Sequence, residues 1–294
     1  MRDDELEILS SHSAQVGSLQ VRRALPQRRR RTVGAWCFAD HMGPADVSED
    51  SGLDIGPHPH TGLQTVTWLI DGQALHRDSL GSEQVISAGE LNLMTAGHGV
   101  SHAEEATGHY HGTLQGIQLW IAQDDQRRDS PAGFEHHDDL PRVELGAGEA
   151  TVFIGEFGGA RSPARREGEL LGAQLKVRGA VAIGLEPTFE YGAIVLEGLV
   201  ELDGEALGPG ALGYLKPGRT DLALTAREPS TLILLGGVPL AHEIFMWWNF
   251  VARSRAEIDA AYDSWRDNDG RFGQVDSPLA RVESPAPYWR NSAG

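Results

Sequence analysis

Short apolar runs alternate with glycine- and proline-containing turns along most of the chain. The runs of the first half lie at 19–25, 33–44, 58–70, 74–79, 91–95 and 114–122. A second set follows at 150–156, 172–177, 180–185, 192–202, 211–215, 220–225 and 231–235. β-Branched and aromatic residues within such runs, with Gly or Pro at their ends, favour strands joined by tight turns. The pattern therefore predicts an all-β protein.

Two of these runs carry a more specific prediction. The run at 58–70 has apolar or β-branched residues on both faces, which is typical of a strand buried on both sides. We expect it to form one continuous strand. The run at 33–44 ends in Gly43-Pro44, a dipeptide that marks turns, so we expect the chain to turn there.

The C-terminal part of the chain has a different periodicity. Ser254-Arg-Ala-Glu257 has the form of a capping box, in which the serine and glutamate side chains satisfy the first backbone groups of a helix. Ile258, Ala261 and Trp265 follow at helical spacing. We expect one short C-terminal helix that packs its apolar face against a barrel.

The chain is long enough for two domains. It has 294 residues, and the composition becomes polar and charged at 124–141, between the two sets of runs. We place the linker there and expect an N-terminal domain at 1–136 and a C-terminal domain at 137–294. After residue 137 the chain has a single histidine, His242, so a histidine-based site is expected in the N-terminal domain alone.

Charge and composition narrow the range of partners. A net charge of −17 argues against direct binding to nucleic acid, and the arginine run at 28–31 fits a solvated loop or strand edge. The single cysteine, Cys37, excludes an internal disulfide and fits a reducing cytosol. The first residues have no apolar segment typical of a signal peptide, and no run reaches the length of a membrane span. We expect a cytoplasmic protein without a membrane partner.

Two pairs of polar residues carry the candidate chemistry. His58 and His60 are two residues apart, as are His102 and Glu104, and side chains at this spacing in a strand lie on one face. A single histidine in a strand is usually a core or surface residue satisfied by a hydrogen bond. Two such pairs on neighbouring strands would instead present three imidazoles and one carboxylate to a common point, which favours a metal site. With no thiolate in the set, Fe(II), Mn, Co, Ni, Cu and Zn all remain open.

These residues lie in stretches that strongly resemble the two cupin motifs of the pirin family. The stretches are Gly56-Pro-His58-Pro-His60-Thr-Gly-Leu-Gln64 and Gly89-Glu-Leu-Asn-Leu-Met-Thr-Ala-Gly97-His-Gly-Val-Ser-His102-Ala-Glu104. Further pieces that resemble pirin signatures are Arg22-Arg-Ala-Leu-Pro26, Phe38-Ala-Asp-His-Met-Gly-Pro44, Gly116-Ile-Gln-Leu-Trp120 and Leu235-Gly-Gly-Val-Pro-Leu240. The resemblance covers nearly the whole chain and is densest from residue 22 to residue 122.

The resemblance implies a fold and a metal. It implies a bicupin, that is, two stacked antiparallel β-barrels of jelly-roll type with the metal in the N-terminal barrel and no ligands in the C-terminal one. By position, the family's ligands fall on His58, His60, His102 and Glu104, and one divalent metal is expected, with Fe(II) favoured. Bacterial members of the family are associated with quercetin 2,3-dioxygenase activity, and animal members with a nuclear, redox-sensitive regulatory role.

The implied reaction assigns roles to further residues. A flavonol such as quercetin, or a related enediol compound, would react with O2, and Glu104 would be the catalytic residue that takes the proton of the substrate hydroxyl. The pocket candidates are Gln64, Met94, His98, Gln118 and Trp120. Gln64 stands where family members carry Glu, so it can form hydrogen bonds but cannot titrate. His98 stands where relatives often have Arg; on a glycine-flanked bend it would be either a polar contact in the pocket or exposed.

Two other functions would use the same four ligands, and a third would not. A non-enzymatic metal or redox sensor would act through a protein partner, and only turnover separates it from an enzyme. A different metal-dependent cupin enzyme would act on another enediol or catechol-like compound. A purely structural or storage cupin gives no reason for four ligands at this spacing.

Overall fold

The computed structural model describes residues 6–49 and 51–290. Residues 1–5, 50 and 291–294, which belong to the ranges expected for the two domains, lie outside the described residues. The chain divides into two compact units. One consists of Met1–Ala14, Val21–His41 and His137–Leu240, and we call it the apolar unit. The other consists of Gln15–Gln20, Met42–His136 and Ala241–Gly294, and we call it the histidine unit.

Two sheets contain most strands of the histidine unit, and residues 12–14, 21–25 and 36–41 of the larger sheet are grouped by their contacts with the apolar unit. The four-stranded sheet has the order β5-β10-β7-β8, with β5 (Ile55–His60), β7 (Gln73–Asp78), β8 (Glu83–Ser87) and β10 (Val100–Glu105). The seven-stranded sheet has the order β12-β9-β6-β11-β4-β3-β2, with β2 (His12–Val16), β3 (Leu19–Leu25), β4 (Trp36–Val47), β6 (Leu63–Asp71), β9 (Leu91–Thr95), β11 (Gly112–Ala122) and β12 (Gly133–His137). From β5 to β11 the chain passes repeatedly between the two sheets, as in a jelly roll.

The apolar unit is also built from two main sheets. Its seven-stranded sheet has the order β1-β22-β19-β24-β17-β14-β13, with β1 (Glu7–Ser10), β13 (Arg142–Glu144), β14 (Gly148–Ile154), β17 (Leu170–Val177), β19 (Glu190–Glu197), β22 (Ala211–Leu215) and β24 (Ser230–Gly237). Its four-stranded sheet has the order β18-β23-β20-β21, with β18 (Ala180–Gly184), β20 (Val200–Leu202), β21 (Glu205–Leu207) and β23 (Asp221–Ala226). A short pair, β15 (Glu156–Phe157) and β16 (Ala160–Arg161), completes the unit. The predicted all-β fold is confirmed, and each unit contains one seven-stranded and one four-stranded sheet.

The two four-stranded sheets share one connectivity. Strands β18, β23 and β20 occupy the places in the apolar unit that β5, β10 and β7 occupy in the histidine unit. In the apolar unit these strands turn Val181, Ile183, Leu222 and Leu224 toward the seven-stranded sheet, where they belong to a single buried core. The strands that correspond in order to β5 and β10 therefore carry buried apolar side chains instead of imidazoles.

The prediction of one continuous strand at 58–70 is wrong. Strand β5 ends at His60, β6 begins at Leu63, and the two belong to different sheets. Gly62 between them has a φ of +67°, and a Cβ built on it would lie 2.3 Å from the carbonyl oxygen of Val251. Only glycine fits this bend without strain. The turn expected at Gly43-Pro44 is also absent, because both residues lie inside β4.

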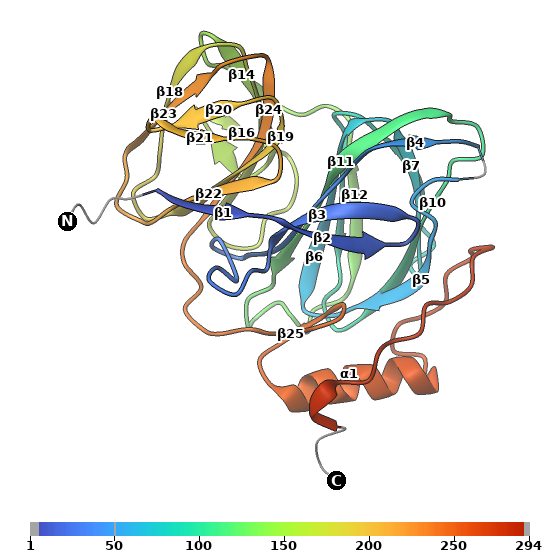
Figure 1. The fold of residues 1–294 in the computed structure, drawn as a ribbon. Helices are drawn as coiled ribbons and strands as arrows, with labels where there is room; N and C mark the ends of the chain where they lie inside the picture. The colour runs from blue at the N-terminus through green and yellow to red at the C-terminus, as the bar shows by residue number, and fades with distance from the viewer. Residues whose placement is uncertain (1–5, 50, 291–294) are drawn as a thin grey trace. The chain divides into compact units, whose positions relative to one another are not determined.

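The C-terminal helix is confirmed. Helix α1 (Arg255–Asp267) begins at Ser254, whose hydroxyl accepts the backbone N–H of Glu257 at 3.3 Å. Its apolar face packs against β26 (Phe250–Ala252), which pairs with β25 (Phe245–Trp247). Figure 1 shows α1 next to β25. A short 3-10 helix, η1 (Tyr288–Arg290), follows later in the chain. No helix within residues 6–49 and 51–290 has the length and apolar character needed to cross a membrane.

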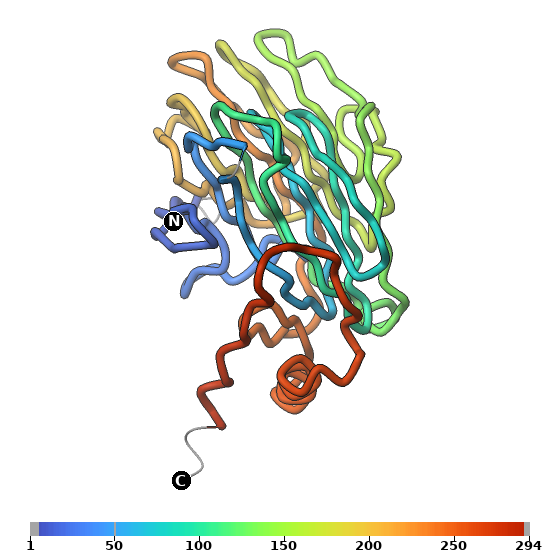
Figure 2. The backbone as a smooth tube through the Cα atoms, turned by 90° about the vertical axis from the view of Figure 1, so that its right-hand side faces the viewer, coloured from blue at the N-terminus to red at the C-terminus, as the bar shows by residue number. Residues whose placement is uncertain are grey.

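The segment after α1 returns along the free edge of β5. The backbone N–H of Val282 donates to the Pro57 carbonyl at 2.9 Å, and the ring N–H of Trp265 donates to the Val282 carbonyl at 2.9 Å. This segment is the red trace that follows the helix in Figure 2. The helix and tail therefore group with the histidine unit, whereas the sequence placed them in a domain at 137–294. Covering the edge of β5 satisfies backbone groups that would otherwise be open to pairing with another chain.

We predict that Ser254→Ala lowers the free energy of unfolding by about 1 kcal/mol, because the N-terminal amides of α1 lose a side-chain acceptor. Urea unfolding followed by tryptophan fluorescence measures the change. Ser254→Asn, which restores a capping oxygen, should recover most of the loss. Equal stability of the wild type and Ser254→Ala would show that the cap does not stabilise the helix.

Candidate metal centre

Strands β5, β10 and β7 lie side by side and direct a set of polar side chains to one face. In the antiparallel register, His58 is opposite His102, His60 is opposite Val100, and Glu104 is opposite His76. Side chains of directly opposed residues lie on the same face of a sheet. The pairs His58/His60 and His102/Glu104 therefore converge, as the spacing predicts.

The three histidines are close enough to hold one metal ion. Their ligand atoms all lie within 4.8 Å of one another, and the Nε2 atoms of His60 and His102 are 3.0 Å apart. Two nitrogens that each lie about 2.1 Å from one ion, at right angles, are separated by about 3 Å. The Nδ1 atom of His58 lies 2.9 Å from the Gly56 carbonyl, to which it donates, so Nε2 retains its lone pair. The residues therefore fit a divalent metal.

Burial keeps these imidazoles in the form that can bind a metal. It lowers the pKa of His58 to about 4, even though the hydrogen bond to Gly56 acts in the opposite direction. Burial, reinforced by repulsion from His58, also holds the pKa values of His60 and His102 well below the ordinary value. All three rings are neutral at pH 7 and offer lone pairs rather than protons.

Glu104 lies in the same buried face but is held by a different contact. In the described part of the chain, the ligand atoms that lie within 4.8 Å of one another belong to the three histidines, and Glu104 is not in this group. The Thr67 hydroxyl lies 3.4 Å from Oε1 of Glu104. Burial raises the pKa of Glu104, against the effects of His76 and Thr67. A carboxylate of this kind is a stronger base than an exposed one.

Sequence reasoning missed two residues of this face, His76 and Asp78. The Nδ1 atom of His76 lies 3.4 Å from Nδ1 of His102, and its Nε2 atom lies 3.1 Å from Oδ2 of Asp78. The signal was present, because His76-Arg-Asp78 is another i, i+2 polar pair within a predicted strand. Only the register of β7 beside β10 shows that this pair belongs to the same face.

Three pocket candidates lie on the inward face of the larger sheet. Thr65 of β6 is opposite both Met94 and Trp120, and Thr67 is opposite Gln118. The Trp120 ring packs edge-on against His60, with 5.2 Å between centroids, and the Thr67 hydroxyl lies 3.0 Å from Oε1 of Gln118. Met94, Gln118 and Trp120 therefore share the face that reaches His60 and Glu104.

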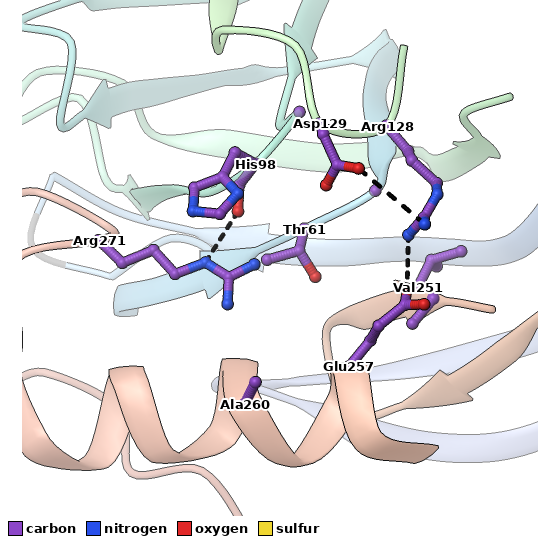
Figure 3. Close-up of a pocket in the computed structure, with 11 residues that line it drawn as sticks. Thr61, His98, Arg128, Asp129, Val251, Glu257, Ala260 and Arg271 are labelled. Atoms are coloured by element: carbon purple, nitrogen blue, oxygen red, sulfur yellow. Dashed lines mark hydrogen bonds and ion pairs between the residues drawn. The ribbon is translucent and has the colours of Figure 1, made fainter. Parts of the chain in front are cut away.

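The other two pocket candidates lie elsewhere. Gln64 is adjacent to Thr65 in β6 and so points to the opposite face, where its Nε2 atom donates to the Thr95 hydroxyl at 2.9 Å. His98 is exposed on the bend between β9 and β10 and lines a separate surface pocket (Figure 3). The carbonyl of His98 accepts a hydrogen bond from Nε of Arg271 in that pocket. The structure does not bring either side chain to the histidines.

Family models match both halves of the chain. The model described as Pirin matches residues 18–121, and the model described as Pirin C-terminal cupin domain matches residues 170–273. A protein of Pseudomonas aeruginosa that carries a provisional quercetin 2,3-dioxygenase name is 44% identical over 295 residues, which cover 98% of this chain and 92% of that protein. A pirin-like protein of Caulobacter vibrioides is 35% identical, with 92% of this chain and 96% of that protein covered.

Solved structures agree with these matches. A crystal structure titled quercetin 2,3-dioxygenase, from Acinetobacter baumannii, superposes with a TM-score of 0.93 at 40% identity and covers 96% of this chain and 95% of that chain. A bacterial pirin from Escherichia coli, crystallised in complex with nickel(II), superposes with a TM-score of 0.63 at 16% identity and covers 80% of this chain and 100% of that chain. The second likeness concerns the fold alone.

We predict that the metal-free protein loses stability as the pH falls from about 6.5 to about 4. In this window the unfolded chain binds a proton at His58 that the folded chain excludes, because the folded pKa is about 4. The effect of His58 alone should reach about 3 kcal/mol. Urea unfolding of chelator-treated protein measures it. The quantity to follow is the free energy of unfolding of the wild type minus that of His58→Asn at each pH. This difference removes the contribution of Glu104, whose raised pKa makes stability increase as the pH falls. A difference that does not change with pH would contradict the prediction.

Proposed function

The chain belongs to the pirin family, and we propose that it is a metal-dependent dioxygenase that acts on a flavonol such as quercetin or on a related enediol compound. The observation that carries the proposal is the buried triad of neutral histidines on β5 and β10, with two Nε2 atoms 3.0 Å apart. The relatives named as quercetin 2,3-dioxygenases support the choice of reaction. A small aromatic substrate and O2 are the implied reactants.

His58, His60 and His102 would hold the metal, with Glu104 as a fourth ligand. When bound, a divalent metal would lower the pKa of a substrate hydroxyl and support redox chemistry with O2. Three imidazoles and one carboxylate suit Fe(II), and Mn, Co, Ni, Cu and Zn accept the same donors. Four protein ligands leave room for a substrate oxygen at the centre.

Glu104 is the proposed base of the reaction. Its carboxylate is buried, and burial raises its pKa, so it accepts a proton more readily than an exposed glutamate. The Thr67 hydroxyl lies 3.4 Å from Oε1 of Glu104 and 3.0 Å from Oε1 of Gln118, and it can donate its single proton to either oxygen. The 3-hydroxyl of a flavonol placed beside this carboxylate would lose its proton to Oε1 or Oε2.

The larger sheet would supply the wall against which an aromatic substrate packs. Trp120 offers a ring beside His60, and Met94 offers a flexible apolar side chain on the same face. Gln118 already lies within hydrogen-bonding distance of the Thr67 hydroxyl and can add a polar contact to a ring oxygen of the substrate. Met94 and Trp120 are buried, so they would help to exclude water from the proton transfer to Glu104.

We predict that His60→Ala abolishes stoichiometric metal binding and metal-dependent O2 uptake with quercetin, because one of three closely spaced nitrogens is lost. Metal analysis of the purified protein and an oxygen electrode measure the two effects after anaerobic reconstitution with Fe(II), Mn, Co, Ni or Cu. His109→Ala removes an exposed histidine of the same unit and should change neither. Circular dichroism should show that both variants keep the β fold.

The same experiment separates the proposal from its main alternative. Wild-type protein with stoichiometric metal and no O2 uptake with quercetin or related enediols would reject the dioxygenase. It would instead favour a metal or redox sensor that acts through a protein partner. Unchanged metal content in His60→Ala would reject the metal centre itself.

We predict that Glu104→Gln lowers kcat by about 10²- to 10⁴-fold at saturating metal, because an amide cannot accept the substrate proton. Steady-state O2 uptake with quercetin measures kcat. Glu105→Gln is a matched control: its side chain points to the other face of β10, where Glu105 pairs with Arg77 at 3.4 Å, and it should retain the wild-type kcat. A wild-type kcat in Glu104→Gln would assign the base to another group.

A further inference from the structure

The pocket of Figure 3 lies within the histidine unit, and none of the three histidines of the candidate metal centre lines it. The bends that follow β5 and β9, the loop after β11 and the segment around α1 form its walls. Its volume is about 260 Å³, just below the range in which proteins bind drug-sized ligands. A cavity of this size accommodates a small metabolite.

Backbone contacts hold the walls of this pocket in place. The N–H of His98 donates to the Ser130 carbonyl at 3.0 Å, and the N–H of Val251 donates to the Thr61 carbonyl at 3.1 Å. Gly97 has a φ of +52°, and a Cβ built on it would lie 2.0 Å from the Ser130 carbonyl oxygen. The neighbouring segments are packed backbone to backbone, so the pocket is formed before a ligand arrives.

Arg271 is a cation of this pocket that lacks a carboxylate partner. Its Nε donates to the His98 carbonyl at 2.9 Å, but neither Nη atom forms a hydrogen bond or an ion pair within residues 6–49 and 51–290. The Phe272 ring, 5.4 Å from Cζ, supplies no acceptor. The side chain is half-buried, and burial lowers the pKa of Arg271, although Asp269 and Asp129 act in the opposite direction. An anion in contact with the Nη atoms would therefore be stabilised.

The other charged groups of the pocket already have partners. Nη1 of Arg128 lies 2.5 Å from Oε2 of Glu257, and Nη2 of Arg128 lies 3.9 Å from Oδ2 of Asp129. With Arg271, two arginines face two carboxylates, so these four side chains carry no net charge. One negative charge on a ligand can pair with Arg271, whereas a second would be repelled by Asp129.

The Thr61 side chain adds a second donor to the pocket. It is buried, and its hydroxyl forms no hydrogen bond with any residue in the described part of the chain. Figure 3 shows the guanidinium of Arg271 extending toward Thr61. Val251, Ala252 and Ala260 line the same pocket with small apolar side chains. A charged donor, a neutral donor and an apolar surface therefore meet in one small cavity.

We propose that this pocket binds a small organic monocarboxylate. The Nη1 and Nη2 atoms of Arg271 would donate to the two carboxylate oxygens as a bidentate pair, and the Thr61 hydroxyl would donate to one of them. The hydrocarbon part of the ligand would pack on Val251, Ala252 and Ala260. The site is additional to the metal centre and goes beyond the proposed dioxygenase.

Isothermal titration of the full-length protein with sodium benzoate, without added metal, tests the proposal. Benzamide has the same shape without the charge, and phenyl phosphate carries a second negative charge near neutral pH. Both should bind at least about 10-fold more weakly than benzoate, because the first lacks a charge-assisted hydrogen bond and the second is repelled by the acidic side of the pocket.

Three variants locate the binding site. Arg271→Gln removes the positive charge and should weaken benzoate binding by about 10- to 100-fold. Thr61→Val removes the hydroxyl and keeps the shape, and it should weaken binding by about 2- to 10-fold. Arg266→Gln is the matched control, because Arg266 is an exposed arginine of α1 that pairs with Asp267 and does not line the pocket. It should bind benzoate as the wild type does.

Nuclear magnetic resonance gives a second, local measurement. The Nε–H resonance of Arg271 can be assigned in ¹H–¹⁵N spectra by its loss in Arg271→Gln. Because Nε belongs to the same guanidinium as the Nη atoms, this resonance should shift as benzoate is added and should stay in place with benzamide. A resonance that does not move while benzoate binds contradicts the assigned site.

The outcomes of the titrations are distinct. Saturable benzoate binding that depends on Arg271 and Thr61, with both analogues weaker, supports the proposal. Wild-type protein without saturable benzoate binding, or with benzamide bound as tightly, overturns it. Phenyl phosphate bound more tightly than benzoate would assign the pocket to phosphate esters and overturn the carboxylate.

The variants decide the remaining cases. Unchanged affinity in a folded Arg271→Gln protein overturns the proposal, because benzoate would then bind elsewhere. If Arg271→Gln does not fold, Thr61→Val and the wild-type comparison of benzoate with benzamide decide. None of these measurements requires metal or turnover, so their failure would leave the proposed dioxygenase standing, and the reverse also holds.

Discussion

The register of three antiparallel strands is the constraint on which the candidate site depends. His58 and His60 on β5, His102 and Glu104 on β10, and His76 on β7 share a face because each is paired in one particular register. A slip of one residue would turn Ser101, Ala103 and Arg77 to that face instead. The tail that pairs with Pro57 covers the edge of β5 and so helps to hold the strand that carries the first two histidines.

The second unit shows what the same connectivity looks like without a polar site. Strands β18, β23 and β20 take the places of β5, β10 and β7, and they bury Val181, Leu224 and Val200 in a continuous apolar core. The fold therefore does not require polar side chains at these positions. Burying imidazoles and carboxylates is unfavourable unless they form hydrogen bonds or bind an ion. Their concentration in one unit therefore indicates a function that resides in the site and not in the fold.

Local sequence signals accounted for the parts of the structure that depend on local geometry. The i, i+2 spacing of His58/His60 and His102/Glu104 predicted their shared face, and the capping box predicted the start of α1. The break between β5 and β6 was missed because it depends on a contact that is distant in sequence. The backbone of Val251 approaches Gly62 so closely that no side chain fits there. His76 and Asp78 were missed because only strand pairing places them beside His102. Gln64 and His98 matched a motif by position, but strand alternation and an exposed bend direct them elsewhere.

Burial makes charge balance a condition for the chemistry of this site. The three histidines are neutral, and Glu104 and Asp78 supply two carboxylates. A divalent cation would favour the ionised form of a nearby carboxylate and would offset its negative charge in a region where unpaired charge is costly. A substrate that released its proton to water would leave an extra negative charge behind. In the proposed reaction, transfer of that proton to Glu104 would keep the total charge of the site constant, which is a physical argument for placing a base within the buried face rather than at its rim.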